Sequence, residues 1–168
     1  MTSIQAKRLI LESAKPEDIG FIINMENDPD NCEFIATYGY EEHLAELNDQ
    51  NKIVLIIKRL KDSLPIGFVL NFIDSESNWF EIRRIAVSDK NKGYGREAMN
   101  ALFKYAFETL SVNKVWLDVY PRNEVGIHLY ESLGMHKDGV LRENMYSSKY
   151  GYRDQIIYSL LKNEYIEK

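Results

Sequence analysis

The spacing of apolar positions changes several times along this chain, and each change predicts a new element. Near the start, the run KRLILES at residues 7–13 is typical of a strand, and the apolar spacing after Pro16 is helical. Residues 27–40 form an irregular stretch, and the segment 41–47 is expected to be a short helix. The first part of the chain therefore predicts a strand followed by two helices.

Three strand-like runs occupy the middle of the chain. They are residues 53–60 (IVLIIKRL), 65–72 (PIGFVLNF) and 79–87 (WFEIRRIAV). Short turn segments separate them, which predicts that they pair as antiparallel neighbours. Because side chains alternate between the two faces of a strand, Glu81, Ile85 and Val87 are expected to point to the same side.

Helices and strands alternate in the rest of the chain. The expected elements are a helix over 93–110, a strand over 114–120, a helix over 123–133 that ends at Gly134, and strands over 139–146 and 155–161. An antiparallel meander thus leads into a strand–helix–strand unit. This order predicts an α/β fold, an α+β sandwich with a mixed, mostly antiparallel central sheet and helices on both faces. At 168 residues, the chain is expected to be one domain spanning 1–168.

The charge balance bears on partners rather than on the fold. With 21 Lys and Arg against 26 Asp and Glu, the net charge of −5 disfavours nucleic acid and anionic membranes as partners and favours cationic ones. Cys32 is the only cysteine, so a reducing compartment suits the chain. No segment approaches the roughly 18 consecutive apolar residues of a membrane span, and the N-terminal segment does not resemble a signal peptide. A cytoplasmic location is therefore expected.

No metal site is expected. The three histidines, His43, His128 and His136, are scattered, and their spacing to each other and to Cys32 does not match a zinc motif. They are most simply surface residues.

The segment Gly93-Tyr94-Gly95, at the start of a predicted helix, is the first candidate for binding chemistry. Its simplest interpretation is a turn. The unpaired N–H groups of a helix N-terminus also attract phosphate, and glycine lets an anion approach the backbone. A nucleotide P-loop is excluded, because Lys92 precedes the glycines instead of following them.

A dinucleotide turn is a closer match. Gly93-x-Gly95-x-x-Ala98 fits the Rossmann pattern, and Asp118 lies at about the right separation to meet a ribose. However, five residues separate the preceding strand from Gly93, and the antiparallel meander upstream does not suit a parallel sheet. A nucleotide-binding oxidoreductase domain is therefore an alternative that the topology disfavours.

An ordered set of motifs resembles the GNAT superfamily of N-acetyltransferases. The set consists of Ile85–Val87, the Gly-x-Gly turn within 90–96, Leu117-Asp118-Val119, Asn123 and the segment LYESLGM at 129–135. The tail, with GVLRE at 139–143 and a late Tyr-rich hairpin, is similar to the subgroup of ribosomal-protein N-terminal and spermidine acetyltransferases. Lys90 departs from the family, which usually has Arg or Gln there, and the loop before Gly93 is shorter than is common.

The resemblance implies that the chain transfers an acetyl group from acetyl-CoA to a primary amine by direct attack in a ternary complex. It implies no metal, and related enzymes are often dimers, so a homodimer is a further implication. The residues implied in acetyl-CoA binding are Ile85, Ala86, Val87, Asn91, Lys92, Gly93, Tyr94, Gly95, Arg96, Asn123 and Tyr130. For Asn123, pure N-capping of the following helix is an equally adequate interpretation.

The resemblance also implies catalytic roles. Tyr130 matches the tyrosine that protonates the leaving thiolate, although a core tyrosine would show the same helical spacing. Two carboxylates are alternatives for the base that deprotonates the amine. Asp118 matches a catalytic glutamate of the N-terminal acetyltransferases, and Glu81 lies on the preceding strand, where Arg83 and Arg84 are obvious partners.

The acceptor cannot be identified from the sequence. Polyamine, protein N-terminus, amino acid and drug amine all stay open. The acidic and aromatic stretch 26–42 is expected either to be a solvated loop or to border the acceptor site, where it would suit a cationic amine. A noncatalytic acyl-CoA-binding or regulatory module on the same fold is the main alternative function.

Overall fold

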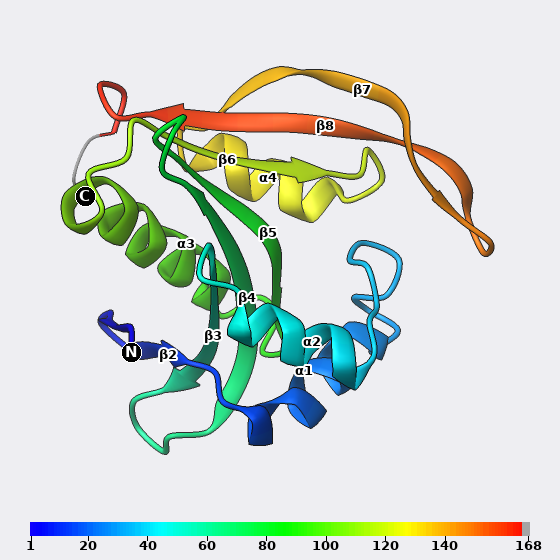
Figure 1. Ribbon diagram of the computed structural model, residues 1–168. Coiled ribbons are helices and arrows are strands. Elements are labelled where there is room, and N and C mark those ends of the chain that lie inside the picture. Colours follow the sequence, from blue (N-terminus) through cyan, green and yellow to red (C-terminus); the bar gives the residue numbers. More distant parts are fainter. Residues whose placement is uncertain (166–168) are drawn as a thin grey trace.

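An eight-stranded sheet forms the centre of the computed structural model, which describes residues 1–165 (Figure 1). Its strand order is β1-β2-β3-β4-β5-β6-β8-β7. The strands are β1 (Ser3–Gln5), β2 (Leu9–Ser13), β3 (Lys52–Arg59), β4 (Pro65–Asp74), β5 (Trp79–Val87), β6 (Lys114–Val119), β7 (His136–Ser147) and β8 (Gly151–Leu161). All neighbours pair antiparallel except β5 and β6, which are parallel. The expectation of a mixed, mostly antiparallel sheet is confirmed.

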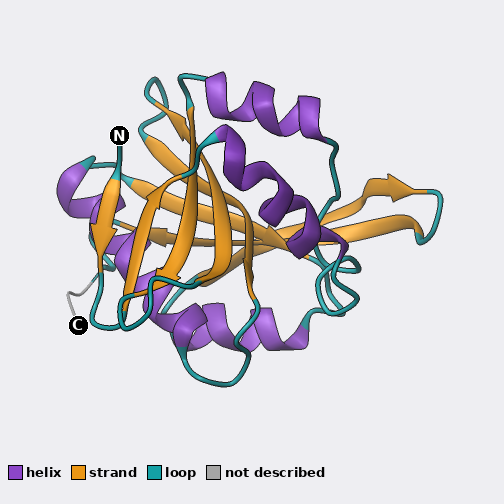
Figure 2. Ribbon diagram, turned by 90° about the horizontal axis from the view of Figure 1, so that it is seen from below, coloured by secondary structure: helices purple, strands orange, loops and turns teal. Residues whose placement is uncertain are grey.

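Helices cover both faces of the sheet (Figure 2). They are α1 (Ile19–Asn27), which follows the 3₁₀ turn η1 (Pro16–Asp18), α2 (Tyr40–Asn48), α3 (Tyr94–Lys104), which continues into the π-helical turn η2 (Tyr105–Thr109), and α4 (Glu124–Ser132). Residues of α3 and α4 pack into the larger apolar core, with Met99, Leu102 and Tyr130 among them. Ile22 and Met25 of α1 pack into a smaller core on the other face, against β3, β4 and Ala86.

The expected elements are present, with one additional strand and two strands that are longer than expected. β1 was not expected, because three residues are too few to show a period. The two C-terminal strands are longer than expected and form a hairpin that extends beyond the rest of the sheet (Figure 2). Tyr146 and Tyr152 near its end are exposed and pack on each other.

β5 and β6 separate after a short paired segment. Their register covers only Trp79–Glu81 of β5, although β5 runs on to Val87. Beyond that point the two strands diverge (Figure 1), so the edge of β5 that faces β6 has no strand partner. A wedge-shaped opening in the sheet results, and the residues of chemical interest lie along it.

A bulge in β5 overturns one expectation about facing. Leu70 pairs with Arg84 and Asn71 with Ile82, so Arg83 is an extra residue in β5. Ile85 and Val87 therefore lie on the same face of the sheet as Phe80 and Ile82, the face that α3 covers. Glu81, between Phe80 and Ile82, points to the opposite face. The prediction that Glu81, Ile85 and Val87 share a side was wrong, because strict alternation fails at a bulge.

Candidate functional site

A cavity of about 330 Å³ occupies the opening between β5 and β6. Its walls come from both strands, from α4 and its preceding loop, and from β7 and β8. The loop between α1 and α2 closes one side, with Phe34, Ile35, Ala36 and Tyr38. Five residues named from the sequence line this one cavity: Glu81, Ile85, Asp118, Asn123 and Tyr130.

Asp118, on β6, is the most perturbed carboxyl group of the cavity. Burial is the main reason that its pKa is raised to about 6, and the neighbouring charge of Glu81 acts in the same direction. Gln155 of β8 donates a hydrogen bond from Nε2 to Asp118 Oδ2, and this bond acts in the opposite direction. A carboxyl group with such a pKa exchanges protons near neutral pH, as a general base requires.

Glu81 has a different environment. Its carboxylate accepts a hydrogen bond from Arg83 Nε at 2.7 Å, and the Arg83 guanidinium lies over the ring of Phe72, 4.5 Å from its centre. The two residues are two positions apart on β5, the spacing at which side chains of a strand share a side. Glu81 is thus committed to an ion pair, whereas Asp118 accepts a hydrogen bond only from a neutral amide.

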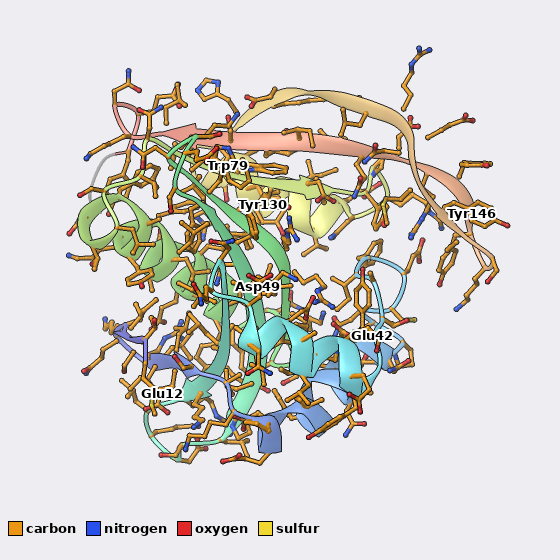
Figure 3. All side chains as sticks on the ribbon, viewed as in Figure 1. Glu12, Glu42, Asp49, Trp79, Tyr130 and Tyr146 are labelled. Carbon is orange, nitrogen blue, oxygen red and sulfur yellow. The ribbon has the colours of Figure 1, made fainter. Side chains whose placement is uncertain are left out.

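Tyr130 lies on α4 between the helix and the sheet (Figure 3). It is buried, with its ring 6.3 Å from that of Tyr158, so it is a core residue and a cavity residue at once. Burial, together with the charge of Asp118, raises its pKa to about 12. The phenol therefore keeps its proton throughout the physiological range.

Asn123 caps α4. Its side-chain oxygen accepts a hydrogen bond from the backbone N–H of Gly126 at 3.0 Å. The capping interpretation is confirmed, and the residue also lines the cavity. Capping does not compete with ligand binding, because the amide nitrogen has two further hydrogens to donate.

The glycine turn is fixed by residues that precede it by more than 80 positions. Gly93 has φ +75° and is the N-cap of α3. Arg8 Nη1 donates to the carbonyl of Lys92 at 3.1 Å, Arg8 Nε binds Glu97 at 2.7 Å, and its guanidinium lies 4.6 Å from the centre of the Tyr94 ring. Arg8, in the turn between β1 and β2, thus connects the edge of the sheet to the glycine turn. The first N–H groups of α3 have no intrahelical partners.

The other residues named for acetyl-CoA binding lie outside the cavity lining. Ala86 and Tyr94 are buried in the two cores, so only their backbone groups are available. Lys92 pairs with Asp89 at 3.5 Å, and Arg96 Nη2 donates to Ser132 Oγ at 2.6 Å, which joins α3 to α4. Asn91 has φ +60° in the loop between β5 and α3. Val87 is the last residue of β5, and Gly95 lies in the first turn of α3.

A buried charge cluster lies on one side of the cavity. Arg84 Nη1 binds Glu26 at 2.6 Å, and Arg84 Nη2 binds both oxygens of Glu46 at 2.5 Å. The two ring nitrogens of His43 face the same two carboxylates, at 3.1 and 3.3 Å. Tyr38 lies over the Arg84 guanidinium and its backbone N–H donates to Glu26. The cluster ties α1 and α2 to β5 immediately beside the bulge.

Sequence reasoning missed part of this arrangement. The stretch 26–42 was expected to be a solvated loop or to border the acceptor, but Glu26 is fully buried, and burial raises its pKa. His43 was expected at the surface and is also buried. The only sign of Gln155 in the sequence is its position as a polar amide at the start of the mostly apolar strand segment 155–161. No local signal paired Arg84 with residues 58 positions away.

None of the helices within residues 1–165 has the length and apolar character needed to cross a membrane. No three His, Cys, Asp or Glu side chains in this range group as candidate metal ligands.

Comparison with known families agrees with the fold. The family described as "Acetyltransferase (GNAT) domain" matches residues 8–136, about three quarters of the chain. The chain therefore belongs to the GNAT acetyltransferase family.

Individual relatives extend this likeness over the whole chain. The spermidine N(1)-acetyltransferase of Vibrio cholerae is 27% identical over 176 residues, which cover 96% of this chain and 97% of that protein. The [ribosomal protein bS18]-alanine N-acetyltransferase of Salmonella typhimurium is 37% identical over 113 residues, or 67% of this chain and 74% of that protein. A chimera of the Vibrio cholerae spermidine N-acetyltransferase SpeG with hSSAT has the same fold, with a TM-score of 0.84, 22% identity and coverage of 96% and 100%.

Proposed function

We propose that this protein transfers the acetyl group of acetyl-CoA to a primary amine that carries positive charge, by direct attack within a ternary complex. The observation that carries the proposal is the convergence of Glu81, Ile85, Asp118, Asn123 and Tyr130 on one cavity, at the place where β5 loses its strand neighbour. One acetyltransferase domain spans the whole chain in this proposal.

The donor binds along the free edge of β5. Backbone groups of Ile85–Val87 have no strand partner on that side and offer hydrogen bonds to an extended pantetheine arm, as an added strand would. The pyrophosphate binds at the turn of residues 91–96, where the N–H groups at the start of α3 attract an anion. Asn123 donates from its amide nitrogen to the arm, and a backbone N–H of β5 holds the oxyanion.

The acceptor binds on the side of Glu81 and Asp118. Two carboxylates and the aromatic rings of Tyr38 and Tyr120 line this part of the cavity, and both features suit a cation. Relatives that act on spermidine or on a ribosomal-protein alanine support an amine of this kind. Between the two, the structure offers no selective contact, so the class proposed is a cationic primary amine.

Asp118 takes the proton from the bound ammonium, directly or through one water. An alkyl ammonium group has a pKa near ~10.4 and only the neutral amine attacks. The amine nitrogen then bonds to the thioester carbonyl carbon, and the carbon–sulfur bond breaks. Asp118 is favoured over Glu81 because its pKa is raised to about 6 and because Glu81 is held by Arg83.

Tyr130 assists the leaving sulfur. With its pKa raised to about 12, the phenol is a weaker acid than a thiol, whose pKa is ~8.5. Its main contribution is therefore a hydrogen bond to the developing thiolate, with proton transfer as the tetrahedral adduct collapses.

The test is release of free thiol from acetyl-CoA in the presence of an amine panel that includes spermidine, an N-terminal alanine peptide and a neutral amide as a blank. We expect turnover with a cationic amine, and a decrease in kcat of about 100-fold or more in Tyr130→Phe, with little change in acetyl-CoA affinity. Tyr146→Phe, at the far end of the hairpin (Figure 3), is the matched control.

Two outcomes contradict the proposal. Binding of coenzyme A without thiol release for any amine would indicate a noncatalytic acyl-CoA-binding module. A thermal shift with NAD and none with coenzyme A would indicate a nucleotide-binding domain.

A cytoplasmic homodimer completes the proposal. The single Cys32 suits a reducing compartment. Mass determination in solution tests the dimer.

A further inference from the structure

A chain of side-chain hydrogen bonds leads from the rim of the cavity to Asp118. Asn144 of β7 donates from Nδ2 to Gln155 Oε1 at 2.5 Å, and Gln155 of β8 donates from Nε2 to Asp118 Oδ2. Gln155 is buried, with 7% of its surface exposed, and all three residues line the same cavity. Three adjacent strands, β7, β8 and β6, each supply one member.

An irregularity in β7 brings Asn144 to Gln155. Leu141 pairs with Gln155 and Met145 with Arg153, so three residues of β7 lie opposite the single residue Asp154. Glu143, within this bulge, has φ +50°, a conformation that is costly for a non-glycine residue. Its backbone N–H donates to Asp154 Oδ1 at 2.8 Å, which holds the bulge in place. Bulges next to binding sites commonly redirect a side chain.

The chain of hydrogen bonds from Asn144 through Gln155 to Asp118, here called the relay, has a defined donor–acceptor direction. An amide can present either its oxygen or its nitrogen to a neighbour. By donating to Gln155 Oε1, Asn144 fixes the Gln155 nitrogen toward Asp118. The carboxylate then receives the Gln155 donor on Oδ2, and Asp118 itself lines the cavity.

We propose that Gln155, oriented by Asn144, is the positioning residue for Asp118, holding its carboxylate in the ionised form at the cavity. This inference rests on the proposed role of Asp118 as the base. Neither amide is itself a catalytic residue, because each acts through Asp118.

Several other ionisable groups lie near Asp118, and those that act on its pKa affect the titration proposed below. They are Glu81 and Arg83 from β5, Tyr130 from α4, Tyr120 after β6, and Arg153 from β8, which lies over the Tyr120 ring at 3.7 Å. Glu81 raises the pKa of Asp118, and Arg83 and the Gln155 hydrogen bond lower it. Removal of the Gln155 donor is therefore expected to raise the pKa of Asp118 above its value of about 6.

The experiment is a ¹³C NMR titration of the aspartate side-chain carboxyl groups, with Asp118 assigned from Asp118→Asn, in the full chain without substrate. Gln155→Met keeps the length of the side chain and removes the donor, and we expect the Asp118 midpoint to rise by about one pH unit. Asn144→Leu leaves Gln155 free to turn and should shift the midpoint in the same direction by less. Tyr146→Leu, on the same strand but at the hairpin end, should leave it unchanged.

The acidic limb of the pH profile of kcat/KM should move with these midpoints. Midpoints of Gln155→Met and Asn144→Leu that equal the wild-type value, or fall below it, would overturn the relay. Since Asn144 is exposed, Asn144→Leu keeps the test available if Gln155→Met does not fold. The titration needs no turnover, so midpoint shifts in a protein that transfers no acetyl group would support the relay while refuting the proposed function.

Discussion

The two ends of the β5–β6 opening are built in different ways. The end where we propose that the donor binds, here called the donor end, consists of nearly consecutive residues: the free backbone edge of β5, a glycine turn and the start of α3. The opposite end is called the acceptor end. The acceptor end is assembled from side chains of α1, α2, β5, β6, β7 and β8, most of them charged or amide groups. One end offers backbone to a ligand, and the other offers buried ionisable groups.

Because the two ends are built differently, substitutions at them should have different effects on binding and on stability. Backbone binding tolerates many side chains but depends on conformation, so glycine is critical there. Buried charges tolerate little, because removal of one partner leaves the other desolvated. Substitutions at the donor end should therefore alter acetyl-CoA binding, and those at the acceptor end should alter stability and pH dependence.

The largest expected effect is that of Arg84→Met. Glu26 and Glu46 would keep their buried carboxylates without the arginine that binds both, so the free energy of unfolding should fall by about 3–5 kcal/mol. Urea denaturation measures it. Arg122→Met is the control: Arg122 is exposed and its ion pair with Glu33 lies at the surface, so we expect a change below about 1 kcal/mol. Equal effects of the two substitutions would contradict the contrast between buried and exposed ion pairs.

A smaller effect is expected from Gly93→Ala at the donor end. Its φ of +75° disfavours any residue with a Cβ, by about 1–2 kcal/mol. KM for acetyl-CoA should rise while the pH profile keeps its shape. Gly139→Ala is the matched control, because no heavy atom lies within 4 Å of the added carbon. An unchanged KM with normal stability would show that the turn does not bind the donor.

The smallest change in stability is expected from Asp118→Asn, and its sign is positive. The pKa of Asp118 rises from 3.8 to about 6 on folding, so between these values the native state binds more protons than the unfolded state. The wild type thus loses stability as pH rises through about 6, and the amide variant does not. The shift of about two pKa units corresponds to at most about 3 kcal/mol at pH 7, and the amide loses part of this gain because it is a weaker acceptor than a carboxylate for the Gln155 donor. We therefore expect the variant to be more stable by about 1 kcal/mol at pH 7, with the difference reversed or absent at pH 4. Thermal denaturation at both pH values measures this.

The donor end was accessible from the sequence because its signals are local. The glycine turn, Asn123 and Tyr130 lie within 40 residues of one another and carry helix-start and helix-stop features that the fold confirms. The facing of Glu81 was predicted wrongly, since the extra residue Arg83 is invisible to a strict period of two. The ion pairs of Arg84 and the hydrogen bond from Gln155 to Asp118 join residues 37 to 58 positions apart, and one sequence contains no signal for such pairing.

The most direct test of the account is the pH dependence of kcat/KM in the wild type and in Asp118→Asn, with a saturating acetyl-CoA concentration and the best amine of the panel. The wild-type profile should fall on its acidic side with a midpoint near pH 6, where Asp118 titrates. Asp118→Asn should lose that limb, with kcat/KM at pH 7.5 lower by about 100-fold or more. An acidic limb that persists in Asp118→Asn with a rate within a few-fold of wild type, and that disappears in Glu81→Gln instead, would contradict the assignment of Asp118 as the base.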